Sequence, residues 1–174
     1  MGYTTDFEGS FLLDRQLDPS HQNYLKAFAE TRRMKRDPKK AELLQDRVRL
    51  AVELPIGIEA GYFVGGTGMM GQNDDVSVTD HNYPPEGQPT LWCQWTPIDD
   101  GYGIQWDNGE KFYKYTEWLE YLIEHFLKPW GYVLNGKVSW QGEDSTDSGV
   151  IYVKDNQVEA VKNKITNNGP SWKN

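Results

Sequence analysis

The chain has 174 residues, of which 37% are hydrophobic and 25% are charged, and its formal net charge at pH 7 is −8. This length fits one domain whose core needs no disulfides, and the composition excludes a largely disordered chain. The negative charge argues against general binding of nucleic acid, because most of the surface would repel phosphates. We therefore expect a single domain over residues 1–162, followed by a polar tail over residues 163–174.

The first part of the chain predicts one strand, one helix and a basic segment. Alternating apolar residues predict a strand from Tyr3 to Leu13. Asp18 followed by Pro19 is typical of a helix start, and the apolar stripe that follows extends this predicted helix to about Arg33. The stretch 35–54 is punctuated by prolines and predicts a short helix or a turn.

Two irregular segments are expected next. The apolar run 62–64 predicts a strand that leads into a glycine-rich loop ending at Gly71. The polar stretch 72–89 predicts the longest irregular segment of the chain. Loops of this length inside a compact domain are often functional.

The window from Trp92 to Trp140 contains six of the seven tryptophans, five of the ten tyrosines and the only cysteine. A hairpin is expected around the turn 99–103. In its first strand, one face should carry Leu91, Cys93 and Trp95. The other face should carry Trp92 and Gln94.

A helix is expected after Asp107 or Asn108, either of which could cap its first turn. Its apolar stripe has the spacing of a helix that packs on a sheet. The stripe consists of Phe112, Tyr115, Leu119, Leu122 and Phe126.

Three short strands complete the predicted fold, over residues 132–141, 149–154 and 157–161. The last two are joined by a two-residue turn at Asp155 and Asn156. The predicted fold class is α+β, an antiparallel sheet of about five to six strands with two main helices packed on one face.

Six short stretches of the sequence carry a resemblance to a known group of proteins. They are residues 1–5, 61–66, 88–95, 118–122, 129–132 and 140–143. The chain resembles small single-domain proteins of bacteria and their phages that open with the same MGYTT start, and the resemblance covers residues 1–162. It implies an intracellular protein and, by analogy, a phage-related role in host interaction or in modulating defence. It carries over no catalytic residue and no cofactor.

The sequence predicts a cytoplasmic protein that does not enter a membrane. No apolar run approaches the roughly 18 residues that a membrane-spanning helix needs, and the amino terminus does not read as a signal peptide. Cys93 is alone, which excludes an intrachain disulfide, and we expect it to be a buried small hydrophobe. We expect no cofactor and no metal site.

A first group of partner-binding candidates lies in the basic segment after the first helix. Residues 31–50 hold eight basic and three acidic side chains. A cluster of this kind suits an acidic partner, although it also suits an ordinary solvated surface. The candidates at its start are Arg32, Arg33, Lys35 and Arg36.

A second group comes from the aromatic residues of the hairpin. Because helices on one side cover only one face of a sheet, aromatic side chains on the other face must be covered by another segment or left open. The sequence leaves open whether the loop 72–89, a second copy of the chain or a separate partner covers them. The candidates are Trp92, Gln94 and Trp106.

The glycine-rich loop is a further candidate, for a ligand instead of a protein. Backbone amides of such a loop can close on a phosphate, although the lysine and hydroxyl of a P-loop are missing here. The candidates are Gly65, Gly66, Gly68, Asp74, Asp75 and His81. They support an alternative function, a small enzyme acting on a phosphorylated or nucleotide-like substrate.

The function predicted first is non-enzymatic binding of a protein partner, with a homodimer as one form of this interaction. Nucleic acid is not the expected partner. No catalytic residue is predicted, because neither the lone cysteine nor the scattered histidines and carboxylates have the spacing of a known catalytic set.

Overall fold

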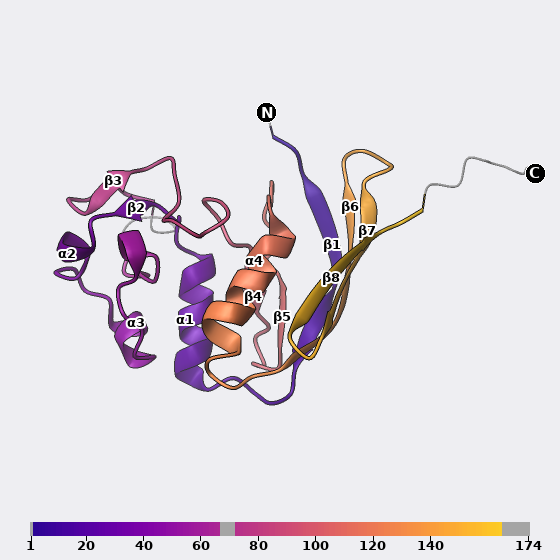
Figure 1. Cartoon of the computed structure of the whole chain (residues 1–174), viewed down its shortest axis with the longest axis horizontal. Coiled ribbons are helices and arrows are strands. Elements are labelled where there is room, and N and C mark those ends of the chain that lie inside the picture. The colour runs from indigo at the N-terminus through magenta and orange to yellow at the C-terminus, as the bar shows by residue number, and fades with distance from the viewer. Residues whose placement is uncertain (1, 67–71, 165–174) are drawn as a thin grey trace, which may run out of the picture.

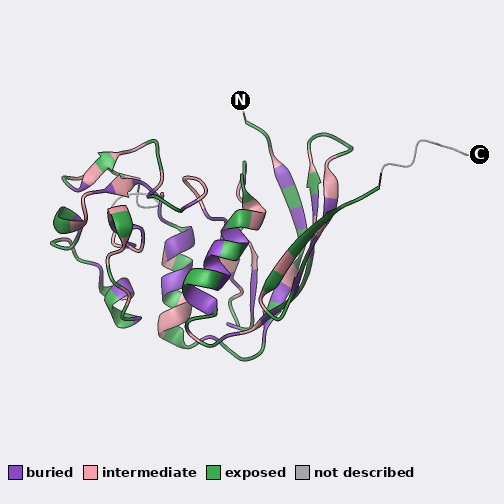
Figure 2. Cartoon of the chain, viewed as in Figure 1, coloured by how far each residue is buried: buried purple, intermediate pink, exposed green. Residues whose placement is uncertain are grey.

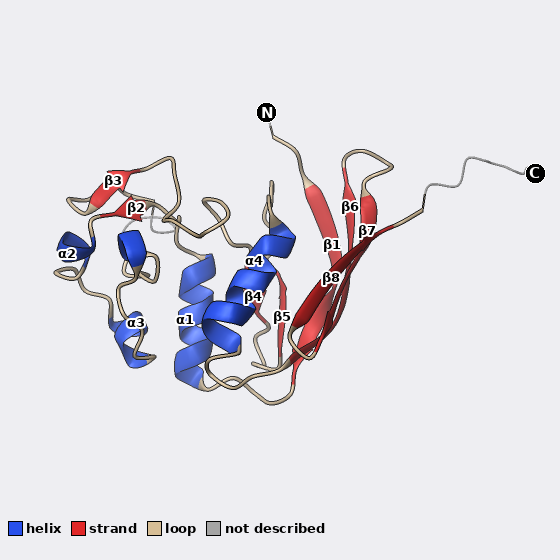
Figure 3. Cartoon of the chain, viewed as in Figure 1, coloured by secondary structure: helices blue, strands red, loops and turns tan. Residues whose placement is uncertain are grey.

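The computed structural model describes residues 2–66 and 72–164. It has an α+β fold built on a six-stranded antiparallel sheet in the strand order β4-β5-β1-β6-β7-β8 (Figures 1 and 3), which confirms the predicted fold class. The strands of this sheet are β1 (Thr5–Leu13), β4 (Trp95–Pro97), β5 (Gly103–Trp106), β6 (Leu134–Gly142), β7 (Ser148–Lys154) and β8 (Gln157–Lys162). A separate small sheet pairs β2 (Lys35–Arg36) with β3 (Val78–Asp80).

Two longer helices lie on the same side of the large sheet (Figure 1). They are α1 (Pro19–Ala29) and α4 (Tyr115–Leu122), and α4 continues into the π-helical turn η3 (Ile123–Leu127). In η3 the Lys128 amide donates to the Ile123 carbonyl at 2.8 Å, the wider spacing that defines a π-helix. The short helices α2 (Pro38–Ala41), α3 (Arg47–Ala51) and η1 (Ile58–Ala60) lie beyond α1, beside the small sheet.

Strand β1 lies at the centre of the sheet and separates its two faces. Phe7, Phe11 and Leu13 are buried toward the helices, whereas Glu8 and Leu12 are exposed on the opposite face. Figure 2 shows the same division, with buried residues on the strands and helices that face one another. The period of two that predicted this strand therefore also decides which residues enter the core.

The core is organised around the ring of Phe7. This ring makes edge-on contacts with four other aromatic rings at centroid distances between 4.9 and 5.7 Å. Such geometry aligns the positive edge of one ring with the negative face of another. The four partners, which come from β4, β5, the segment before α4 and α4 itself, are Trp95, Trp106, Phe112 and Tyr115.

The indole rings of the sheet lie on the helix-facing side, so the expectation that some of them occupy the open face is wrong. Trp95 and Trp140 are buried, and Trp140 lies opposite the core residue Phe7. Trp106 lies opposite Trp95 in the β4–β5 pair, which places both side chains on one face. The reason is that β4 begins at Trp95, so residues 91–94 do not alternate as a strand. The open face carries exposed side chains such as Glu8 and Lys137 in place of the indoles.

The predicted strand over residues 62–64 is also wrong. These residues follow η1 as a turn, in which the Tyr62 amide donates to Ile56 at 3.1 Å and the Phe63 amide to Ala60 at 3.1 Å. The run is apolar because Phe63 and Val64 are buried, and burial of a turn leaves the same sequence pattern as a short strand.

The second long helix begins at Tyr115, later than the sequence predicts. Asp107 accepts a hydrogen bond from the Gly109 amide at 2.8 Å and so forms a local turn instead of a helix cap. Asn108, Lys111 and Lys114 then adopt positive φ angles of 66°, 59° and 56°, which a helix does not tolerate. Phe112 consequently reaches the core from a loop.

Two further expectations concern the ends of the chain and the membrane. Of the predicted tail 163–174, residues 165–174 lie outside the described residues. Within residues 2–66 and 72–164, no helix has both the length and the apolar character needed to cross a bilayer.

The position of Phe7 generates a stability prediction. Phe7→Ala should lower the free energy of unfolding by about 3–5 kcal/mol, because it leaves a cavity between four rings. Urea unfolding followed by tryptophan fluorescence measures this change. Glu8→Ala, one residue away on the open face, is the matched control and should change the same quantity by less than about 0.5 kcal/mol. Equal effects of the two substitutions would contradict the arrangement.

Candidate functional site

A mainly apolar groove of about 550 Å³ opens between the loop around Pro84 and the segment before α4. We call it the aromatic groove. It combines apolar, aromatic and cationic side chains that come from four separate parts of the chain. Its lining residues are Arg32, Asn82, Pro84, Thr90, Leu91, Trp92, Glu110, Lys111 and Tyr113.

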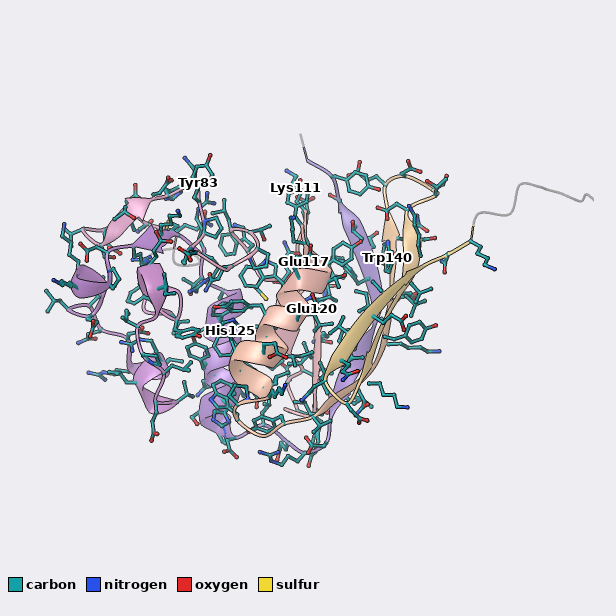
Figure 4. All side chains as sticks on the ribbon, in the orientation of Figure 1. Tyr83, Lys111, Glu117, Glu120, His125 and Trp140 are labelled. Carbon is teal, nitrogen blue, oxygen red and sulfur yellow. The ribbon has the colours of Figure 1, made fainter. Side chains whose placement is uncertain are left out.

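The two sides of the groove are held by contacts with the rest of the fold. On one side, Arg32 Nε donates to the His81 carbonyl at 3.0 Å, which fixes the guanidinium beside the loop 81–84. On the other side, the Tyr113 hydroxyl accepts a hydrogen bond from the Tyr3 amide at 3.0 Å. In Figure 4, Tyr83 and Lys111 lie at the same end of the molecule, on the two segments that border the groove.

Hydrogen bonds to a buried tryptophan of α4 hold the segment 90–92 that lines the groove. The buried Trp118 donates from Nε1 to Thr90 Oγ1 at 2.6 Å, and the Thr90 hydroxyl donates to the Trp92 carbonyl at 3.3 Å. Trp92 itself is half-buried, so part of its ring contributes to the surface of the groove. The structure thus brings together Trp92 and Arg32, which the sequence analysis predicted as candidates in two separate groups.

Gln94 and Trp106, the other two aromatic-window candidates, do not line the groove. Gln94 is buried behind it, where Nε2 donates to the Glu110 carbonyl at 2.7 Å and Oε1 accepts from Trp106 Nε1 at 3.1 Å. Gln94 therefore positions the segment that carries Lys111. Trp106 lies at a different hollow of the molecule, beside α1.

Arg33, although adjacent to Arg32, points into the core. Its Nη2 donates to the carbonyls of Gly61 and Phe63 at 2.8 and 2.9 Å, and its guanidinium lies 4.1 Å from the ring centre of Phe28. Burial lowers the pKa of Arg33, yet a guanidinium remains charged at any ordinary pH. Arg33 thus connects the end of α1 to the turn 61–63 and is not available to a partner.

Arg36 and Lys35 are also engaged within the chain. Arg36 is buried and donates from Nη1 to Asp75 and to Ser77, each at 2.8 Å. Lys35 is half-buried and forms an ion pair with Glu59 at 3.7 Å. Of the four basic candidates, Arg32 is the one that lines the aromatic groove.

The described candidates of the glycine-rich loop are held by separate contacts. Asp74 pairs with His81 at 2.9 Å, and Asp75 pairs with Arg36. Gly65 and Gly66 are half-buried, and a side chain at Gly65 would overlap the Gln45 carbonyl, so Gly65 allows two backbone segments to approach closely. Gly68 lies outside the described residues. Among the described residues, these side chains do not form a phosphate-binding site. A small enzyme that acts on a phosphorylated or nucleotide-like substrate stays a prediction.

Cys93 is fully buried, as the sequence predicts, and burial raises the pKa of its thiol to about 12. A thiol of this kind is not a nucleophile at neutral pH. Within the described parts of the chain, no three histidine, cysteine or carboxylate side chains gather as metal ligands would.

Sequence reasoning missed most of the residues that line the groove. Lys111 and Tyr113 reach it because the chain before α4 turns through left-handed residues instead of forming a helix. Pro84 contributes apolar surface from a segment without periodicity. Leu91 contributes from the stretch 91–94, where the predicted strand alternation is not observed. The one signal present was the excess of proline and aromatic residues around the loop 82–92.

Comparisons of the chain with models of protein families, with curated proteins and with solved structures find no match. The groove must therefore be interpreted from its own chemistry.

The neighbouring arginines give a matched pair of stability predictions. Arg33→Ala should lower the free energy of unfolding by at least about 3 kcal/mol, because it removes two charge-assisted hydrogen bonds and leaves the Phe63 carbonyl without its partner. Arg32→Ala should lower it by less than about 1 kcal/mol, since this side chain lies at the surface of the groove. Chemical unfolding of both variants measures the difference, and a reversed order would refute the placement of the two side chains.

Proposed function

We propose that the protein is a non-enzymatic binding protein that captures an extended segment of a partner protein in the aromatic groove. The observation that carries the proposal is the convergence of Trp92, Leu91 and Pro84 with the cationic Arg32 and Lys111 around one hollow. Binding energy at protein interfaces concentrates in aromatic and arginine side chains that lie in pockets. A volume of about 550 Å³ suits one or two anchoring side chains of such a segment.

The charges around the groove indicate the chemistry of the captured segment. The whole chain has a net charge of −8, whereas the groove is lined by two cations and one carboxylate, Glu110. An apolar anchor flanked by carboxylates complements this pattern. Complementary charge also favours rapid association and selects against basic segments.

The hydrogen bonds that hold the groove support binding without large rearrangement. Arg32 and Tyr113 are each fixed by a backbone partner, and Trp92 is connected through Thr90 to the buried Trp118. A pre-formed site loses less conformational entropy when the partner binds.

The composition of the groove favours binding over catalysis. Among the described residues that line it, Glu110 is the one carboxylate, and there is no histidine or cysteine. Acid–base and nucleophilic mechanisms usually join two titratable side chains by a hydrogen bond. The Tyr113 hydroxyl is bonded to the Tyr3 amide instead, and among the described residues no hydrogen bond joins the side chains of Glu110, Lys111 and Tyr113 to one another.

The biological setting is part of the same proposal. The resemblance to small proteins of bacteria and phages supports capture of a host protein or of a component of a defence system. The expected site of action is the cytoplasm. A homodimer, in which a second copy occupies the groove, is the competing form of the interaction, and analytical ultracentrifugation of the purified chain distinguishes the two.

The test is capture of the partner by wild-type and altered chains. Tagged protein is expressed in its native host, co-purified proteins are quantified, and the best candidate is then titrated against purified chain by calorimetry. Trp92→Ala should weaken the measured affinity by at least about a hundredfold, and Arg32→Glu by a comparable factor, because both remove central contacts. Charge reversal is confined to Arg32, since reversal at Arg33 would unfold the chain.

Two exposed residues outside the groove serve as matched controls. Tyr152→Ala removes an exposed aromatic ring from the open face of the sheet, and Arg47→Glu reverses an exposed charge at the start of α3. Both variants should bind like the wild type. If Trp92→Ala and Tyr152→Ala bind equally well, the groove is not the binding site.

A substitution at Glu110 tests the charge of the captured segment. Glu110→Gln should strengthen binding by about twofold to fivefold, because it removes the one repulsive carboxylate at the surface of the groove. The gain should shrink as salt concentration rises. Calorimetric titrations at low and high salt measure both effects, and weaker binding of Glu110→Gln would show that the segment is basic.

A further inference from the structure

A second hollow, with a volume of about 620 Å³, lies between α1 and the β4–β5 hairpin. We call it the polar cavity. Among the described residues it shares no lining side chain with the aromatic groove, and its chemistry is different. Carboxamides and carboxylates dominate its lining, and they include Gln22, Asn23, Glu30, Gln105, Asp107 and Asn108.

These groups match the hydroxyls of a saccharide. A carboxamide both donates and accepts hydrogen bonds, as a sugar hydroxyl does, and a carboxylate accepts from two hydroxyls at once. Among the described lining residues, Lys26 is the one cation, against the carboxylates Glu30, Asp99 and Asp107. This net negative charge disfavours a phosphorylated ligand, while Lys26 and the neutral amides disfavour a simple cation.

Trp106 supplies an aromatic wall for the same cavity. Its Nε1 donates to Gln94 Oε1 at 3.1 Å, and its ring packs edge-on against Phe7 at 5.3 Å, so the indole is held in one orientation. Trp106 is half-buried and is one of the residues that line the cavity. A fixed indole offers a flat apolar surface with a negative face, which suits the C–H face of a pyranose ring.

The polar groups near Trp106 are also held in place. The Asp107 amide donates to the Gln94 carbonyl at 2.9 Å, and one Asp107 oxygen accepts from the Gly109 amide at 2.8 Å. On the opposite side, Gln22 Nε2 donates to the Asp99 carbonyl at 3.1 Å, which ties α1 to the hairpin turn.

We propose that the polar cavity binds a neutral saccharide, with one sugar ring against Trp106 and its hydroxyls bonded to the carboxamides and carboxylates of α1 and the β5–α4 segment. This site is separate from the aromatic groove. It would make the chain a protein with two recognition surfaces of different chemistry.

The test is a titration of ¹⁵N-labelled protein with three neutral trisaccharides, maltotriose, cellotriose and N,N′,N″-triacetylchitotriose. At least one should produce saturable shifts at the Trp106 indole and at the Asn108 amide, with a Kd of about 1 mM or tighter. Trp106→Phe identifies the indole signal.

A double variant removes two carboxamides without disturbing the backbone. Asn23→Ala is made on an exposed helical position, and Asn108→Gly suits the positive φ of 66° at that residue. This double variant should weaken saccharide binding by at least about tenfold. Trp92→Ala, in the aromatic groove, should leave saccharide binding unchanged, so failure of either proposal is recognised separately.

Three outcomes would overturn the proposal. The first is the absence of saturable shifts with all three trisaccharides up to about 20 mM, a concentration well above the expected Kd. The second is unchanged binding by the double variant. The third is binding of the polyamine spermidine at these residues with no response to sugars, which would identify the cavity as a cation site.

Discussion

The contacts of one phenylalanine ring determine where the aromatic groove and the polar cavity lie. Phe7 projects from the central strand β1 and touches rings from β4, β5, the segment before α4 and α4 itself. Because Phe112 must reach this ring, the chain between β5 and α4 is held against the sheet as a loop. One end of that loop contributes Asp107 and Asn108 to the polar cavity, and the other contributes Lys111 and Tyr113 to the aromatic groove.

A second constraint is the buried guanidinium of Arg33. It joins the end of α1 to the turn 61–63 by donating to two backbone carbonyls, and its Nε also donates to Gln88 Oε1 at 3.3 Å. A buried cation without a carboxylate partner costs solvation energy, and here dipoles of the backbone and the ring of Phe28 offset that cost. Through Gln88, this cluster also fixes the loop that ends at the floor of the aromatic groove.

Much of the fold follows from patterns that are local in sequence. The alternation in β1, the strands β6 to β8 and the apolar stripe of α4 could be predicted because each is decided by a period of two or 3.6 residues. The aromatic groove was predicted only in part. Arg32 and Arg33 are identical in type and adjacent, and no period near the end of α1 indicates which of them points inward. Lys111 and Tyr113 were missed because left-handed residues, which sequence periodicity does not reveal, direct the chain before α4.

Because Cys93 is buried, its reaction with a thiol reagent reports local or global unfolding of the native chain. The Cys93 thiol is buried in the core, and its sulfur lies 3.8 Å from the backbone carbonyl oxygen of Trp95 in β4. A thiol reagent therefore cannot reach the sulfur while β4 is paired in the sheet. Reaction with such a reagent must wait for β4 to detach or for the molecule to unfold. The labelling rate therefore depends on the free energy of β4 detachment or of unfolding. No introduced probe is needed, because the chain contains no second cysteine.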